Sequence, residues 1–350
     1  MIIMNKIFNK VVLFVVASFS CIACTEVDLC QNEEHPHMGV VEISYKWNSA
    51  KVDNNMVVMP YRIVNEWSCV YISSSDGATG HYISNNPDAA LTDNIFKVKA
   101  GELRFLSFSY DVENKGFSYM NALSETAISR NSVAVEYKAY TLDNPIIKDA
   151  YGENISELVD SRFNYILNGN LFTPIYSHYT GVKDITTGVN FVEFSPKNIL
   201  DNYQFNFNIS AKDVTVDKVI AQLSGIPYRY NFTKESPEAD SIATVLFDVN
   251  NVGASEYLGN AIITGLLRAD NSKDLTGTGV LSLAIFVTDA SGESKVYKVS
   301  TNLYNYIPGF DNLLYGSDRE FHIDAPIVIT NNGLNVSVAS TTGAVWSKVL

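Results

Sequence analysis

The sequence predicts an all-β protein made of packed antiparallel β-sandwiches. Apolar and polar residues alternate with a period of two in many short segments, which is typical of strands with one buried face and one wet face. Clusters of Asn, Asp, Gly and Ser separate these segments, and only residues 155–167 show a convincing helical pattern. Many short strands with so little helix indicate sandwich folds.

Residues 1–23 have the layout of a secretory signal peptide. Lys6 and Lys10 form a basic start, and an apolar stretch from Val11 to Ala23 follows. As a helix, this stretch would rise roughly 20 Å at about 1.5 Å per residue, which is too short for a hydrocarbon core of about 30 Å. We therefore expect residues 1–23 to be removed on export.

Cys24 is the predicted lipidation site. Small Ala23 stands directly before it, as in the lipobox that lipoprotein signal peptidase cuts ahead of an acylated cysteine. Cys21 replaces the leucine that usually stands three residues before that cysteine, and it is the alternative lipidation site. With Cys24 acylated, the Cys-x-x-Cys spacing holds no metal, because one cysteine is lost and the other becomes a thioether. Several acyl chains would anchor the protein stably in a membrane, whereas one chain binds marginally.

Residues 24–37 are predicted to be a lipidated linker. Glu26 and Asp28 resemble the acidic signal that directs Bacteroidota lipoproteins to the outer face of the outer membrane, and a solvated acidic linker is the alternative. His35 and His37 flank a proline beside two glutamates, but they lack the four-ligand spacing of a structural zinc site. We predict no metal and no other cofactor.

Charge and cysteine content limit the partners and the compartment. The net charge is −13, and loss of Lys6 and Lys10 with the signal peptide makes it −15, which argues against a nucleic-acid partner. Cys30 and Cys69 could form one disulfide in an oxidising compartment. Cys69 lies in an apolar run, so an inert buried thiol is the other outcome.

A seam between two groups of expected strands is placed at Ser195–Pro196. The proline there favours a break, because a residue before proline is driven out of helical conformation. About 325 residues remain after cleavage, which suggests two domains, residues 38–195 and 196–350. Before the seam, strands are expected over residues 40–47, 56–64, 68–73, 103–110, 132–142 and 188–194. After it, they are expected over residues 203–209, 214–223, 244–249, 261–267, 280–288, 295–303 and 320–329.

Motifs that would indicate an enzyme are missing from the sequence. It contains no G-x-S-x-G elbow, no H-E-x-x-H, no P-loop and no G-x-G-x-x-G after a strand. His81, His178 and His322 stand alone, so we predict no catalytic residues. Asp240-Ser241-Ile242 matches a loose O-glycosylation sequon of secreted Bacteroidota proteins, which makes Ser241 a candidate modified residue.

Taken together, several motifs resemble the fimbrillin-associated anchor lipoproteins of Bacteroidales. The matching features are Cys24 and Cys30 around an acidic spacer, His35-Pro36-His37 before a strand that ends in Trp47, the start of a strand at residues 100–103, the seam at 195–197 and a turn at Leu223-Ser224-Gly225-Ile226. The resemblance extends over nearly the whole mature chain. It implies two tandem transthyretin-like β-sandwich domains, a role at or near the base of type V fimbriae, and no catalytic residues.

Arginine positions separate the roles within that family. Polymerising fimbrillins resemble donor-strand systems, in which a protease cuts after an arginine near the first strand and exposes a groove for another subunit. No arginine occurs between Cys24 and Tyr61, and Arg62 is the first. We therefore expect a non-enzymatic anchor or accessory subunit at the outer-membrane surface.

The expected partners are membrane lipid, through the acyl chains, and fimbrial subunits, through strand addition to a sheet edge. Two alternatives stay open: a polymerising fimbrillin subunit, and a surface glycan-binding lipoprotein. The second alternative would need a row of exposed aromatic residues on one face.

Overall fold

The protein structure is a computed structural model. It describes residues 38–47, 56–63, 69–71, 81–83, 95–109, 117–120, 134–152, 155, 165–167, 174–240, 242–269, 275, 277–306, 313–330, 333–336 and 347–349. The predicted signal peptide and lipidated linker lie outside these residues.

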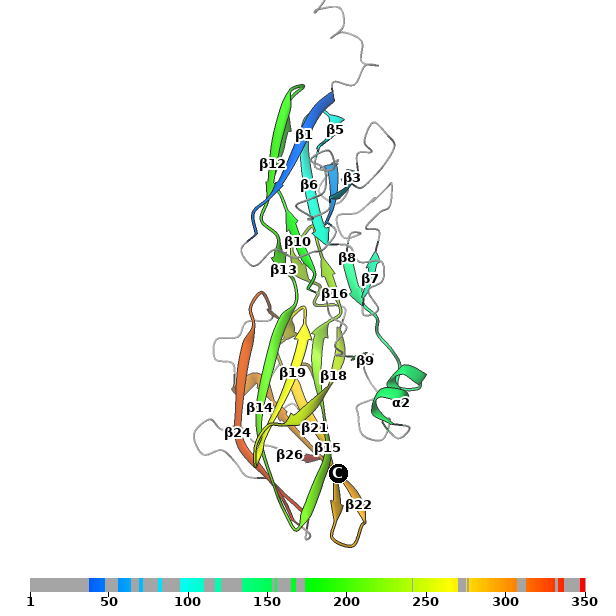
Figure 1. The fold of residues 1–350 in the computed structure, drawn as a ribbon, viewed down its shortest axis with the longest axis vertical. Coiled ribbons are helices and arrows are strands. Elements are labelled where there is room, and N and C mark those ends of the chain that lie inside the picture. Colours follow the sequence, from blue (N-terminus) through cyan, green and yellow to red (C-terminus); the bar gives the residue numbers. More distant parts are fainter. Residues whose placement is uncertain are drawn as a thin grey trace, which may run out of the picture.

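The described strands confirm the prediction of an all-β fold with sandwich-like packing of sheets. The molecule is elongated, with smaller sheets in its upper part and one large sheet in its lower part (Figure 1). In the upper part, a three-stranded sheet has the order β12 (Val189–Phe194), β1 (Met38–Tyr45) and β5 (Ile95–Lys99). A seven-stranded sheet has the path β13 (Lys197–Asn198), β10 (Tyr176–Tyr179), β6 (Gly101–Ser109), β2 (Met56–Ile63) and β3 (Cys69–Tyr71), with β11 (Lys183–Ile185) paired to β6 and β4 (His81–Ile83) paired to β2.

The large sheet contains ten of the described strands. Its path is β25 (Gly333–Val336), β24 (Arg319–Thr330), β14 (Asp201–Lys212), β19 (Glu256–Ile263), β18 (Ile242–Asn251), β15 (Val214–Pro227), β21 (Val280–Asp289), β22 (Ser294–Asn302) and β26 (Ser347–Val349), and β9 (Tyr165–Leu167) pairs with β18. Most neighbours are antiparallel. The pairs β1–β12, β14–β24 and β9–β18 are parallel.

Two small sheets complete the described strands. One has the order β17 (Ser236–Pro237), β16 (Arg229–Asn231), β8 (Ala134–Tyr137) and β7 (Phe117–Met120), and the other pairs β20 (Leu266–Leu267) with β23 (Leu313–Leu314). A short 3-10 helix, Leu303–Asn305, follows β22.

Strand β14 shows why alternation predicts the fold correctly. Tyr203, Phe205, Phe207 and Ile209 are all buried, whereas the residues between them are exposed or half-buried. The Phe205 ring stacks on Phe321 of β24, with ring centroids 4.9 Å apart. One face of β14 therefore supplies the core of the large sheet, and the other face meets solvent.

The buried apolar residues form two main cores. The smaller core lies in the upper part, between β1, β2, β6 and β12, and includes Val41, Val58, Phe105 and Phe194. The larger core belongs to the ten-stranded sheet, but it also contains residues from β6 and β8. The two cores are thus built from overlapping parts of the chain.

Pairing between strands crosses the predicted seam at Ser195–Pro196. Strand β8, from before the seam, pairs with β16 from after it, and β9 pairs with β18 in the same way. Residues 195 and 196 themselves lie between β12 and β13. The division into residues 38–195 and 196–350 stays a prediction.

The expected helix over residues 155–167 is wrong at its end, because residues 165–167 form strand β9. This strand pairs with Thr244, Val245 and Leu246 of β18, so a place in the large sheet overrides the local helical pattern. A helix, α2 (Pro145–Tyr151), occurs earlier instead. Asn144 caps it by accepting a 3.0 Å hydrogen bond from the Ile146 amide, and proline stands at its first position.

The turn expected at Leu223–Ile226 is also wrong, because these residues continue strand β15 through a register shift. Gly225 has a φ of +83° at this bulge. A Cβ atom there would lie 2.6 Å from the Thr278 Cβ. Glycine alone tolerates both the positive φ and the lack of space for a Cβ atom.

Candidate functional site

The first described strand, β1, is an integral part of the upper sandwich. It lies between β12 and β5, and its inward side chains Val41 and Ile43 are 0% and 3% exposed. They pack in the same core as Val58, Phe105 and other residues of β2 and β6. Removal of β1 would therefore expose part of this core and leave both neighbouring strands without a partner.

Aromatic side chains at the end of β1 also pack against the neighbouring strands. The Tyr45 ring stacks against Trp47 and Phe194, and Trp47 meets the Tyr176 ring edge-on with centroids 5.3 Å apart. The Tyr45 hydroxyl lies 2.8 Å from Ser107 Oγ of β6. Burial raises the pKa of Tyr45, so this hydroxyl stays protonated and able to donate.

A close approach of backbones fixes the start of β1. A Cβ atom on Gly39 would overlap the carbonyl oxygen of Thr186 and lie 2.5 Å from Ile185 Cγ2. Asn190 organises the turn there, because its Oδ1 accepts from the Thr186 amide at 2.9 Å and its Nδ2 donates to the Gly188 and Val40 carbonyl oxygens. The turn before β12 is therefore tied directly to β1.

The outer face of the three-stranded sheet carries exposed apolar side chains. Phe191 is 73% exposed and Val189 is 58% exposed on β12, and Ile95 is 45% exposed on β5. The other exposed large apolar side chains in the described part are Ile146, Val182, Val252, Val296 and Tyr315. Phe191 and Tyr315 are thus the two large exposed aromatics there, and the row that a glycan-binding surface would need does not appear among these residues.

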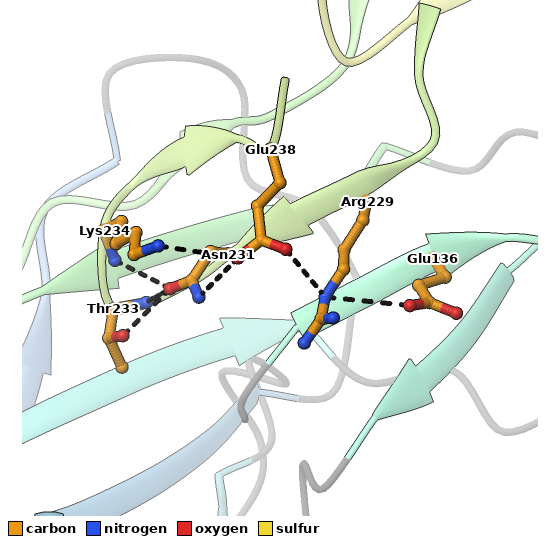
Figure 2. A network of polar contacts seen from close by, with 6 residues as sticks. All are labelled: Glu136, Arg229, Asn231, Thr233, Lys234 and Glu238. Carbon is orange, nitrogen blue, oxygen red and sulfur yellow. Dashed lines mark hydrogen bonds and ion pairs between the residues drawn. The ribbon is translucent and has the colours of Figure 1, made fainter. Parts of the chain in front are cut away.

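A polar network joins strands from before and after the predicted seam. Arg229 of β16 lies opposite Glu136 of β8. The Arg229 Nε is 3.7 Å from a carboxylate oxygen of Glu136 and 3.1 Å from a carboxylate oxygen of Glu238 (Figure 2). Asn231 donates to Glu238 at 3.1 Å, and its Oδ1 accepts from the Thr233 and Lys234 amides. These contacts form a half-buried junction between β8, β16 and β17.

Asp201 lies buried at the start of β14. It is 3% exposed, and its Oδ2 accepts from the Gly316 amide at 2.7 Å. Burial raises its pKa to about 6, and the negative charge of Asp318 adds to this increase. Hydrogen bonds from the Gly316 and Ser317 amides and the positive charge of Arg319 act in the opposite direction. The neighbouring Asp318 accepts from the Asn202 amide at 2.7 Å.

The predicted site residues lie outside the part of the chain that the structure describes. This applies to Cys21, Cys24, Glu26, Asp28 and Ser241. Their assignments stay predictions, as does the state of the cysteines at 30 and 69.

Two of the isolated histidines have described environments. The Nδ1 atom of His178 accepts from the Ser195 amide at 3.3 Å, and burial lowers the pKa of this histidine. His322 is exposed and lies 3.3 Å from a carboxylate oxygen of Glu320.

Metal-binding clusters and membrane-spanning helices are both missing from the described residues. No group of three or more His, Cys, Asp or Glu side chains there is arranged to hold a metal ion. None of the helices in the described segments has the length and apolar character needed to span a membrane.

The described strands define an all-β protein of packed sheets, and solved structures contain similar folds. A candidate adhesin from Bacteroides ovatus aligns with 82% of this chain and 93% of its own, at 11% identity and a TM-score of 0.50. The fimbrial anchor protein Mfa2 from Porphyromonas gingivalis aligns with 86% of this chain and 95% of its own, at 11% identity and a TM-score of 0.41.

Candidate polysaccharide-binding proteins from Bacteroides thetaiotaomicron align with 89% of this chain and 98% of their own, at 9% identity and a TM-score of 0.41. No family model and no curated protein sequence matches the chain. At such low identity, the alignment with the Bacteroides ovatus protein shows a shared fold and says nothing about activity.

Proposed function

We propose that the chain is a non-enzymatic cell-surface lipoprotein, a fimbrial anchor or accessory subunit held in the outer membrane by acyl chains on Cys24. Its partners in this proposal are the membrane lipid and fimbrial subunits that add a strand to one of its sheets. The lipobox at Ala23–Cys24 and the acidic residues Glu26 and Asp28 support the location. The fold shared with a candidate adhesin is compatible with this role.

The observation that carries the proposal is the position of β1. This strand is the first described element after the predicted lipid anchor, and its two neighbours and the buried Val41 and Ile43 hold it in the sandwich. A tether at Cys24 would therefore lead through the predicted linker to a strand that is part of the folded core. No arginine lies between Cys24 and Tyr61, so no cut after arginine can fall in the linker or within β1.

The anchor is tested by substitution of the two candidate cysteines. In cells fed a labelled fatty acid, Cys24→Ala is expected to abolish labelling and leave an uncut precursor, whereas the matched variant Cys21→Ala keeps the label. Mass spectrometry of the mature N-terminus should find a triacylated or diacylated Cys24. An unmodified Cys24, or a mature form that begins after β1, would overturn the proposal and favour a polymerising subunit.

Surface exposure has its own test. Protease treatment of intact cells should degrade the wild-type chain, and a variant with Glu26→Ala and Asp28→Ala should be protected while still acylated. Exchange of the more distant acids Glu33 and Glu34 for alanine gives a charge-matched control. Equal protection of wild type and both variants would rule out a surface location.

A further inference from the structure

Strand β12 has one edge without a partner among the described strands. It pairs in parallel with β1, where the Val40 amide donates to the Gly188 oxygen at 3.0 Å and the Lys46 amide donates to the Phe194 oxygen at 2.8 Å. In a parallel ladder, alternate residues of a strand direct both backbone groups to the same neighbour. Even-numbered residues of β12 therefore bond to β1, and the odd-numbered residues direct their N–H and C=O groups to the open edge.

The same odd-numbered residues carry exposed side chains. Val189 and Phe191 are 58% and 73% exposed, and Glu193 is exposed as well. Across the sheet, Phe191 lies in register with Glu42, and Glu42 lies in register with the exposed Ile95. Within the described part of the chain, the open edge thus presents three backbone positions without a ladder partner, beside an apolar patch.

Two carboxylates, those of Glu42 and Glu193, lie beside this patch. Neither Glu42 nor Glu193 makes an ion pair or side-chain hydrogen bond with another described residue. Lys46 lies beyond Ser44, which is in register with Glu193, but no ion pair joins Lys46 to that carboxylate. A basic side chain on an incoming strand would therefore find a carboxylate available.

The β12 edge also lacks two of the features that usually protect an edge, lysine and proline. Native edge strands are short, or carry lysine or proline. The opposite edge strand of the same sheet, β5, has lysine at two of its five positions, Lys97 and Lys99. Strand β12 has six residues with neither lysine nor proline, and it is the longest edge strand among the described sheets.

We infer that the open edge of β12 binds an extended segment of another protein as an added strand. Apolar side chains of that segment pack beside Val189 and Phe191, and a lysine or arginine lies beside Glu193. This inference rests on the proposed function, because it places the strand addition of a partner subunit at a defined edge.

A second copy of this chain fits the edge less well. Antiparallel pairing of two β12 strands about Phe191 would place each Glu193 opposite a valine, so both carboxylates would stay without a cation. The net charge of −13 on each chain would also oppose the approach. A partner with basic residues satisfies the edge, whereas a second copy does not.

A synthetic peptide tests the inference on the full chain. The probe is acetyl-Lys-Thr-Ile-Thr-Ile-Thr-Lys-amide with a fluorescent label, whose symmetric pattern suits both strand directions. Anisotropy should show saturable binding, and NMR-detected amide exchange should slow at Val189, Phe191 and Glu193 relative to the peptide-free protein. The amides of Asn190 and Val192 already bond to β1 and should change little. Absence of binding, or uniform slowing along β12, would overturn the inference.

Two N-methylated peptides show whether binding uses a strand ladder. One carries N-methyl groups on its Lys and Ile residues, and the other carries them on its Thr residues. Only one set of amides can face β12, so one peptide should lose at least about tenfold in affinity while the other binds like the probe. Equal affinities of the two methylated peptides would contradict edge pairing.

Variants of the protein locate the peptide on this edge. Phe191→Pro removes an N–H that points away from β1, and proline is tolerated at such edge positions, so we expect at least about tenfold weaker binding with β1 still in place. Glu193→Lys should bind the lysine probe more weakly by a similar factor, and it should bind a probe that has glutamates in place of the lysines. Unchanged binding by both variants would place the peptide elsewhere and overturn the inference.

The outcomes separate this inference from the proposed function. Peptide binding by a chain whose Cys24 is unmodified would support the edge and overturn the anchor. An acylated chain that does not bind the peptide would support the anchor and overturn the edge. A dimer that Phe191→Pro dissociates would assign the edge to a second copy and contradict the inference.

Discussion

The Tyr45 hydroxyl and Ser107 Oγ lie 2.8 Å apart in the upper sandwich, and this contact links β1 to β6. Ser107 is 0% exposed, so a lost partner would leave its hydroxyl unpaired in the core. We expect Tyr45→Phe to lower the free energy of unfolding by about 0.5–1.5 kcal/mol in urea denaturation. Tyr315→Phe makes the same chemical change at an exposed residue and should have little effect. Equal effects of both variants would contradict this role for Tyr45.

Gly39 should not tolerate a larger residue. In Gly39→Ala, the added methyl group meets the Thr186 carbonyl oxygen and the Ile185 side chain, so the turn or β1 must shift. We expect a loss of about 1–3 kcal/mol in unfolding free energy. Gly188→Ala is the matched control, because its nearest atom would be Thr186 Oγ1 at 3.9 Å. A Gly39→Ala protein as stable as Gly188→Ala would show that β1 does not approach this turn so closely.

Asp201 should make stability depend on pH. Its pKa of about 6 in the folded protein lies above its ordinary value of 3.8, so the folded state binds this proton more tightly than the unfolded state. The resulting stability is fully present below pH 3.8 and is lost as pH rises through about 6. Between about pH 4 and pH 7, the unfolding free energy of Asp201→Asn should change less than that of the wild type. The difference between the two changes should be about 1–2 kcal/mol.

Asp289→Asn is the control for this titration. Hydrogen bonds from Ser291 and Glu293 and the nearby Lys295 lower the pKa of the exposed Asp289 to about 2, which is below the tested range. Its replacement should leave the slope of stability against pH unchanged there. If Asp201→Asn followed the wild-type slope, another group would have to account for the pH dependence.

The junction of Arg229 with Glu136 and Glu238 should matter more than an exposed ion pair. Arg229→Met removes the cation that Glu136 and Glu238 share, and it leaves the 12% exposed Glu238 with only the more exposed Lys234, 3.8 Å away, as a cation among the described residues. We expect a loss of about 1–3 kcal/mol in unfolding free energy. Lys295→Met breaks the exposed contacts with Asp289 and Glu293 and should change stability little. The reverse order in a denaturant titration would contradict this ranking.

Strands in which apolar and polar residues alternate, with one face buried and the other exposed to solvent, were predictable from sequence. The clearest case is β14, where Tyr203 to Ile209 predicted both the strand and its buried face. The short strand β9 was not, because Tyr165–Leu167 takes its conformation from pairing with β18. For α2, the Asn144–Pro145 pair is a readable start signal that apolar periodicity does not reveal.

The edge of β12 could be predicted only in part. Alternation predicted a strand over residues 188–194, but its parallel pairing with β1 depends on the fold of the whole upper part. That pairing decides which backbone groups are free, and it places Phe191 on the outer face. The lipidation and export residues show the opposite case, since short motifs predict them and the described structure does not include them.

The placement of β1 also determines how the molecule would respond to a tensile load. β1 runs roughly along the long axis, with ladders to β12 on one side and β5 on the other (Figure 1). A pull applied ahead of Met38 would strain both ladders in shear, because their hydrogen bonds stand across the strand direction. Many bonds would then have to break together, so the strand nearest the proposed membrane tether is also placed to resist mechanical extraction.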